Sequence, residues 1–307
     1  MIRRRLVLAA GLSLLAFAAD GTGARAADRV PVVASFSILG DFVREVGGDR
    51  ADVTELVGPN ADAHVYQPSA ADARRLAAAR LVVVNGLGFE GWMDRLVKAS
   101  GTSAAMVTAA SSVAPLTLEA GDGHAHGADG RPSPDPHAWQ DARNARLYVA
   151  AIRDGLTGVD PAGAEYYRAR ADAYLARLDA LDAEIRAAVA RIPEDRRRVV
   201  TSHDAFAYFG RAYGLAFIAP QGVSTDAEAS ARDVARIIRQ IRAEKIPAVF
   251  LENVTDPRLV ERITRETGAR IGGRLWSDAL SARDGPAGTY IEMMRSNIRE
   301  LTSALAG

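Results

Sequence analysis

One long helical stretch near the middle of the chain constrains the fold more than any other feature. Residues 161–191 lie between Asp160-Pro161 and Pro193, and no proline interrupts them. Apolar side chains recur there at steps of three and four residues, the period of one helix face, at Tyr174, Leu178, Leu181, Ile185, Ala188 and Ile192. At 1.5 Å per residue the stretch would reach about 45 Å. We therefore predict one continuous connecting helix within residues 160–193, rather than two helices with a break, and expect it to hinge poorly.

On both sides of this stretch, short β-rich runs alternate with helical patterns. In the first half, strands are expected at residues 30–35, 52–57, 81–85 and 105–108, with helices at 39–46, 70–78 and 92–99. In the second half, strands are expected at 198–202, 215–218, 248–251 and 269–272, with helices at 205–213, 231–243, 257–267 and 286–305. Near-continuous apolar strands such as 81–84 are typical of parallel sheets covered on both faces. The predicted fold is α/β, with two lobes over residues 27–159 and 194–307, each a mostly parallel four-stranded sheet flanked by helices.

The first 26 residues have the three parts of a secretory signal peptide. Three arginines precede an apolar run over residues 6–19, and Ala24-Arg25-Ala26 matches the small-residue cleavage pattern. The run is shorter than the roughly 20 residues of a membrane span, so an uncleaved anchor is the less favoured alternative. Because the chain has no cysteine, we expect neither a lipid anchor nor disulfides. We expect cleavage near Ala26 and a periplasmic location, reached by either the Sec or the twin-arginine route.

Four polar side chains stand in distinctive local settings. His64 and Asp278 lie just beyond expected strands, His203 follows the strand at 198–202, and His137 follows a glycine-rich loop. The carboxyl ends of strands in open α/β sheets face the ligand crevice, so we expect these groups to meet there, two from each lobe. Taken singly, each histidine would more often be a surface or core residue, and Asp278 a helix cap. The set of four is what indicates a metal site.

Five segments of the sequence resemble the metal-binding proteins of ABC transporters, the zinc and manganese group of periplasmic solute-binding proteins. They are His64-Val65-Tyr66-Gln67-Pro68, residues 85–92, Asp135-Pro136-His137-Ala138-Trp139, residues 201–209 and residues 278–281. The resemblance covers nearly the whole chain after the signal peptide. It implies two α/β lobes bridged by a rigid helix, with metal held at their interface by His64, His137, His203 and Asp278.

Two positions depart from the family pattern. Ala63 stands where a proline commonly precedes the first histidine, and Gln140-Asp141-Ala142 replaces the commoner Leu-Asp-Pro. Neither departure removes one of the four implied ligands, although each alters a segment next to one of them.

The choice of metal depends mainly on His203. The resemblance implies histidine at this position in zinc-binding members and often glutamate in manganese- and iron-binding ones. Three imidazoles and one carboxylate also suit tetrahedral Zn²⁺, whereas Mn²⁺ prefers more oxygen ligands. We therefore predict a high-affinity Zn²⁺-binding protein, with a manganese-binding transport protein of the same fold as the alternative. A zinc hydrolase is disfavoured, because no H-E-x-x-H segment exists and Asp278 would close the fourth coordination position, so we expect no enzyme activity.

The resemblance also implies partners. Zn²⁺ would be the transported ligand, delivered to the permease of an ABC importer and its ATPase, and a periplasmic metallochaperone is a further candidate partner. The formal net charge is zero, from 38 basic and 38 acidic residues, and gives no electrostatic reason to expect nucleic acid. We expect a monomer.

Two further groups of residues have open roles. Residues 121–130 carry His124 and His126 in a short glycine-rich segment similar to a shortened histidine-rich loop of zinc-binding members. The segment either captures zinc weakly or is a plain linker, and the sequence favours neither. Glu228 and Glu252 could support the site from strand or loop ends, but solvated carboxylates are the favoured interpretation.

Overall fold

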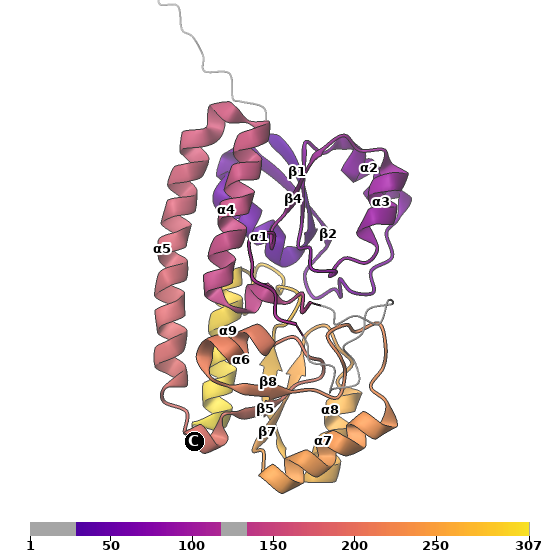
Figure 1. Ribbon diagram of the computed structural model, residues 1–307, viewed down its shortest axis with the longest axis vertical. Helices are drawn as coiled ribbons and strands as arrows, with labels where there is room; N and C mark the ends of the chain where they lie inside the picture. The colour runs from indigo at the N-terminus through magenta and orange to yellow at the C-terminus, as the bar shows by residue number, and fades with distance from the viewer. Residues whose placement is uncertain (1–28, 118–133, 307) are drawn as a thin grey trace, which may run out of the picture.

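The computed structural model describes residues 29–117 and 134–306, which form two parallel four-stranded sheets, one in each half of the molecule (Figure 1). The N-terminal sheet has the order β2-β1-β3-β4 and consists of β1 (Val30–Phe36), β2 (Ala51–Val57), β3 (Leu81–Val84) and β4 (Ala105–Thr108). The C-terminal sheet has the order β6-β5-β7-β8 and consists of β5 (Arg198–Val200), β6 (Ala216–Ile218), β7 (Ala248–Glu252) and β8 (Arg270–Leu275). Every strand pairing in both sheets is parallel. The predicted fold class is confirmed.

The N-terminal lobe has the expected helices α1 (Ser37–Gly47), α2 (Ala70–Ala78) and α3 (Met93–Ser100). A capping box starts α2, because the Ser69 hydroxyl accepts from the backbone of Asp72 while the Asp72 carboxylate accepts from the backbone of Ser69. Helix α3 ends at Gly101, whose φ of 60° is the left-handed conformation that glycine adopts without strain. All four residues of β3 are buried, which accounts for their continuous apolar character.

The C-terminal lobe contains α6 (Ala207–Tyr213), α7 (Ala231–Glu244), α8 (Arg258–Thr267) and α9 (Tyr290–Leu305). Helix α9 begins at Tyr290 rather than at residue 286, because Thr289 is its N-cap and accepts from the backbone of Glu292. Strand β8 extends to Leu275, beyond the expected residues 269–272. The pairing of β8 with β7 shifts its register between Ile271 and Arg274. Gly273, with a φ of 123°, lies in this shift, and the strand continues beyond it.

The connecting helix is α5 (Ala164–Val189), which is continuous over 26 residues and runs the length of both lobes in Figure 1. It is shorter than predicted at its start, because Pro161–Gly163 form a separate 3₁₀ turn. A second long helix, α4 (Ala142–Val159), packs beside it and was missed by the sequence analysis. Its buried face recurs at three- and four-residue steps and includes Ala145, Tyr148, Val149, Ile152 and Leu156.

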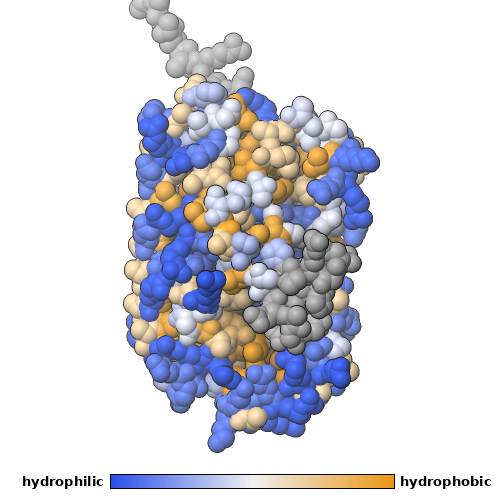
Figure 2. All heavy atoms as spheres, viewed as in Figure 1, coloured by the Kyte–Doolittle hydropathy of each residue, from blue (hydrophilic) through white to orange (hydrophobic). Residues whose placement is uncertain are grey.

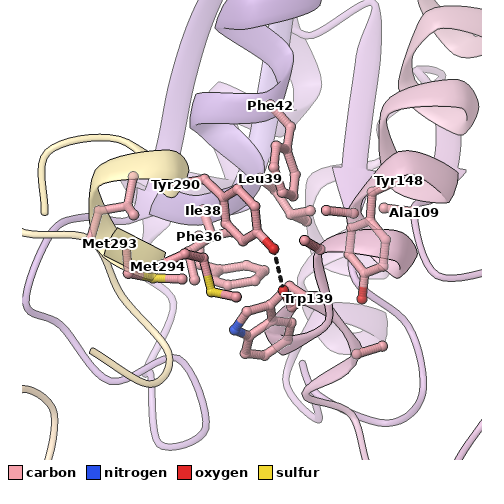
Figure 3. Packing of buried hydrophobic residues seen from close by; sticks show 14 of the residues in the cluster. Phe36, Ile38, Leu39, Phe42, Ala109, Trp139, Tyr148, Tyr290, Met293 and Met294 are labelled. Atoms are coloured by element: carbon pink, nitrogen blue, oxygen red, sulfur yellow. Dashed lines mark hydrogen bonds between the residues drawn. The ribbon is translucent and has the colours of Figure 1, made fainter. Parts of the chain in front are cut away.

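One apolar core is shared between the lobes. Trp139 from the N-terminal half packs on Phe36, and Tyr290 at the start of α9 packs on Phe42 of α1, with ring centroids 5.1 and 4.7 Å apart (Figure 3). The Tyr290 hydroxyl donates to the Trp139 carbonyl at 2.6 Å. A smaller separate cluster lies under α7 and α8. Because burying each large side chain contributes about 1.5–3 kcal/mol, this shared core opposes large movements of one lobe against the other.

On the face shown in Figure 2, hydrophilic residues cover most of the outer end of the C-terminal lobe, whereas the outer end of the N-terminal lobe is mixed. None of the helices in the described ranges is long and apolar enough to cross a membrane. The expected signal peptide, residues 1–26, lies outside the described residues.

Candidate metal centre

The structure brings the four sequence-predicted site residues together where the two lobes meet. One ligand atom from each of His64, His137, His203 and Asp278 lies within 4.8 Å of every other. His64 Nε2 is 3.3 Å from His137 Nε2 and 3.4 Å from Asp278 Oδ2. Asp278 Oδ1 is 3.5 Å from His137 Nε2, and Asp278 Oδ2 is 3.1 Å from His203 Nε2. The four side chains therefore converge on one point.

His137 is fixed by the aspartate two residues before it. Asp135 Oδ1 accepts the backbone N–H of His137 at 2.9 Å and lies 2.8 Å from Nδ1 of its ring. An acceptor at Nδ1 keeps the proton there, which leaves Nε2 free to face the centre. The Tyr208 hydroxyl of α6 donates to the Asp135 carbonyl at 3.1 Å, so the C-terminal lobe helps to hold this segment.

His64 is held by a similar local turn and by an aromatic neighbour. Its backbone N–H donates to Asp62 Oδ1 at 2.9 Å, and Phe89 packs edge-on against its ring with centroids 4.6 Å apart. Phe89 follows Gly86 and Gly88, which both have positive φ. The Glu90 carboxylate closes this loop by accepting the backbone N–H of Asn85 at 2.6 Å. Residues 85–92, one of the segments that resemble the family, therefore form the loop that places Phe89 against the ring of His64.

His203 follows β5 and is held by Glu252, the last residue of neighbouring β7. Glu252 Oε1 accepts the backbone N–H groups of Ser202 and His203 at 2.7 and 2.9 Å, and Glu252 Oε2 lies 2.6 Å from His203 Nδ1. Glu252 is only 4% exposed. The favoured interpretation of Glu252 as a solvated carboxylate is therefore wrong. One feature of the sequence could have indicated this role. Glu252 comes one residue after the strand expected at 248–251, and the neighbouring strand leads to His203.

Asp278 lies in a loop after β8 that both lobes hold. Trp139 Nε1 and Gln140 Nε2 of the N-terminal half donate to the Ser277 carbonyl at 2.9 and 2.7 Å. From the C-terminal lobe, Asn253 Oδ1 accepts the backbone N–H of Ser277 at 3.2 Å. The departure at Gln140 thus supplies a hydrogen bond between the lobes, next to the residue that carries the carboxylate.

The buried charges perturb one another strongly. Burial opposes a charge on His203, but the carboxylates of Glu252 and Asp278 outweigh it and raise the pKa of His203 well above its ordinary value. Burial alone would raise the pKa of Asp278, yet the positive charge of the facing imidazoles holds it well below its ordinary value. Neither oxygen of Asp278 receives a well-formed hydrogen bond from the described residues. A buried, ionised carboxylate without well-formed hydrogen bonds requires a cation beside it, and a divalent metal would supply that charge.

Access to the centre is from the side of His64. His137, His203 and Asp278 are fully buried, whereas His64 lines a cleft between the lobes. Phe89 and Pro136 form one side of this cleft, and Ser224 and Glu228 form the other. Glu228 is exposed, as the sequence analysis favoured. His124 and His126 lie outside the described residues.

Two α/β lobes with a buried His₃Asp cluster between them define a two-lobed metal-binding protein. Residues 32–304 match the family described as "ZnuA: Zinc-uptake complex component A periplasmic", and the chain belongs to this family of substrate-binding components of metal ABC transporters. The resemblance inferred from the sequence motifs is confirmed.

Individual relatives carry the names of different metals. The chain is 35% identical over 320 residues to the zinc-binding protein TroA of Treponema pallidum, covering 100% of both chains. It is 34% identical over 287 residues to the manganese-binding lipoprotein MntA of Halalkalibacterium halodurans, covering 94% of this chain and 90% of the relative. It is 33% identical over 283 residues to the iron-binding protein YfeA of Yersinia pestis, covering 91% and 88%.

The fold is also that of a solved relative. The structure of the periplasmic zinc binding protein TroA from Treponema pallidum matches with a TM-score of 0.84 at 32% sequence identity, covering 91% of this chain and 100% of that chain. The similarity to these relatives therefore establishes a metal-binding protein, but it does not determine which metal binds.

Proposed function

We propose that this protein captures Zn²⁺ in the periplasm and delivers it to the permease and ATPase of an ABC importer. The observation that carries the proposal is the donor set. His203 supplies a third imidazole nitrogen opposite Asp278, and Glu252 holds that ring with Nε2 toward the centre. Nitrogen-rich sites with one carboxylate favour Zn²⁺ over the harder Mn²⁺.

The spacing of the donor atoms supports the same metal. In a tetrahedron with metal–ligand bonds of about 2.0–2.1 Å, neighbouring donors lie about 3.3 Å apart. Four separations in the site, with both oxygens of Asp278 counted, run from 3.1 to 3.5 Å, and one ligand atom from each residue lies within 4.8 Å of every other. The four residues are therefore close enough to share one zinc ion.

Manganese transport is the second candidate, favoured by one feature of the site. Asp278 faces the imidazoles with both carboxylate oxygens, Oδ1 toward His137 and Oδ2 toward His203. Bidentate coordination would add an oxygen donor and move the set toward what Mn²⁺ prefers. The name of the relative MntA, a manganese-binding lipoprotein, fits this alternative.

The proposed function also includes the export of the protein, its oligomeric state and the loading of its metal. The arginines, apolar run and A-x-A pattern within residues 1–26 support export with cleavage near Ala26. We propose that the protein is a monomer. We also propose that it has no enzyme activity, because Asp278 closes the fourth coordination position that a catalytic zinc leaves open. Loading by a periplasmic metallochaperone, with His124 and His126 as the receiving segment, belongs to the same proposal.

The direct test is metal analysis of protein purified without added metal, followed by titration of chelator-stripped protein with Zn²⁺ and with Mn²⁺. We expect one tight zinc per chain, and a chain lacking residues 121–130 should keep it. Tighter binding of Mn²⁺ than of Zn²⁺ would favour the second candidate. Absence of any tight metal would refute both.

A further inference from the structure

The two Asp-x-His turns of the site use their aspartates differently. Asp62 and Asp135 each accept the backbone N–H of the histidine two residues later at 2.9 Å. Asp135 Oδ1 also faces the ring of its own histidine. Asp62 Oδ2 instead accepts a hydrogen bond from Thr225 Oγ1 at 2.5 Å. Thr225 belongs to the C-terminal lobe, so the Asp62 carboxylate joins the backbone of His64 to the opposite lobe.

Thr225 lies in a segment that we call the cleft loop, residues 221–229. The base of this loop is fixed, since Gln221 N–H donates to the Ser202 carbonyl at 3.3 Å and the Gln221 side chain donates to the Ala227 carbonyl at 2.7 Å. Cavities flank the loop on both sides, and Glu228 lines both of them. Asp204 N–H also donates to the Gly222 carbonyl at 3.2 Å, and the bond from Thr225 to Asp62 ties the loop across the lobes.

Among the four residues of the metal centre, His64 lies nearest to solvent. His137, His203 and Asp278 are fully buried, whereas His64 is of intermediate exposure, and its segment is held by Asp62 and by Trp92 Nε1, which donates to the Ala63 carbonyl at 2.7 Å. His64 alone among the four lines the cleft. A metal ion that leaves through the cleft must pass this side chain, and the hydrogen bond from Thr225 holds the turn that carries it.

We propose that Thr225 is a positioning residue that slows metal release, because its hydrogen bond to Asp62 holds the cleft loop against the His64 turn. This inference rests on the proposed function, since it concerns the dissociation of the captured ion. It assigns to this one hydrogen bond the control of how long the ion stays, separately from the ligands that determine which ion binds.

The test compares zinc dissociation rates, measured by transfer of Zn²⁺ from the loaded full-length mature chain to an excess of a chromogenic chelator. Thr225→Val keeps the shape of the side chain and removes the hydroxyl. We expect dissociation to become about 10- to 150-fold faster, the effect of losing a hydrogen bond to a charged group. Thr225→Ser keeps the hydroxyl and should restore a rate within about twofold of wild type.

Two further variants separate positioning from general loosening of the loop. Ser224→Ala removes the neighbouring hydroxyl, which accepts from the Asp226 backbone within the same loop, and should leave the rate unchanged. In an Asp62→Ala background, Thr225→Val should add little, because its acceptor is already gone. The metal-free melting temperature of Thr225→Val should stay close to wild type. If that variant is destabilised, Thr225→Ala is compared in the same way.

The outcomes distinguish this inference from the proposed function. If the wild-type chain holds no zinc tightly, the proposed function fails. If the wild type holds zinc and Thr225→Val releases it at the wild-type rate, or if Thr225→Ser releases it as fast as Thr225→Val, the role of Thr225 is refuted while the zinc site stands. Equal acceleration by Ser224→Ala would also refute it, because the effect would then belong to the loop and not to this hydrogen bond.

Discussion

Glu252 Oε2 lies 2.6 Å from Nδ1 of His203, while Oε1 of the same carboxylate accepts two backbone N–H groups of the segment that carries this histidine. One side chain at the end of β7 thus holds the backbone of the segment that follows β5 and faces the ring of His203. Partners of this kind set the tautomer and the orientation of a metal-binding imidazole. Removal of Glu252 should therefore weaken the site without removing a ligand.

We expect Glu252→Gln to reduce zinc affinity about 10- to 100-fold, the usual effect of losing such a partner of a metal-binding histidine. The amide preserves the size of the side chain but carries no charge, and one of its two ends donates rather than accepts. Competition titration with a chelator at neutral pH measures the effect. Glu228→Gln is the matched control, because Glu228 is an exposed carboxylate that lines the cleft. Equal loss in both variants would contradict the role of Glu252.

Substitution of His203 should change which metal is preferred. We expect His203→Glu to weaken Zn²⁺ binding and to improve Mn²⁺ binding relative to it, because a nitrogen donor is replaced by harder oxygen. His203→Ala should lower affinity for both metals by opening the site. Parallel titrations of the two variants with Zn²⁺ and Mn²⁺ give the ratio. Unchanged zinc affinity in His203→Ala would show that this residue is not a ligand.

The sequence predicted most of the fold because its strongest signals are periodic and local. The apolar face of α5, the apolar strand β3 and the motifs around the site residues identified the architecture before any contact was known. Helix α4 was missed although its buried face has the helical period. The start of α9 was placed early, because the threonine cap at Thr289 was not weighed against the proline at 286.

The support around the site was harder to predict, because it depends on contacts between distant segments. Trp139 contacts Ser277 across 138 residues of sequence, and Thr225 contacts Asp62 across 163. No local pattern marks such pairs. Glu252 is the exception, since the ends of neighbouring parallel strands lie close together, and Glu252 ends the strand that pairs with β5.

A buried carboxylate away from the metal centre should make stability depend on pH. Burial, the largest cause, raises the pKa of Asp41 to about 6, with Glu45 adding to the shift and the Tyr290 backbone N–H opposing it. The native state therefore favours the protonated form. The resulting stabilisation is fully present below the unfolded pKa of about 3.9 and is lost as pH rises through 6.

Asp41→Asn should remove this dependence. Its amide oxygen can still accept the Tyr290 backbone N–H, without a charge to desolvate. A shift of about two units corresponds to about 3 kcal/mol, so we expect the metal-free variant to be about 1–3 kcal/mol more stable than wild type near pH 8. The difference should vanish near pH 4. Urea unfolding at the two pH values measures it, and Asp49→Asn at an exposed position is the control. A constant difference at both pH values would show that ionisation of Asp41 is not the cause.

Zinc binding should depend on pH through His203. Its raised pKa means that the protonated ring stabilises the metal-free protein below about pH 6.5, and that this contribution is lost as pH rises through the higher folded pKa. The lowered pKa of Asp278 has the opposite sign: its contribution is present above about pH 4 and is lost in stronger acid. Zinc needs the neutral ring, so near neutrality it must displace this proton.

The stabilisation that zinc gives should accordingly grow with pH between about 5 and 8, and it should keep rising above the ordinary histidine pKa of about 6.5. At free zinc about 1,000 times the dissociation constant, it would amount to roughly 4 kcal/mol. Melting temperatures of the metal-free and zinc-loaded chains across this range measure the difference directly. In Glu252→Gln, which removes one of the two carboxylates that raise the pKa of His203, the rise should be complete at lower pH. A zinc-induced shift that is the same at pH 5 and pH 8 would show that protons and metal do not compete at His203.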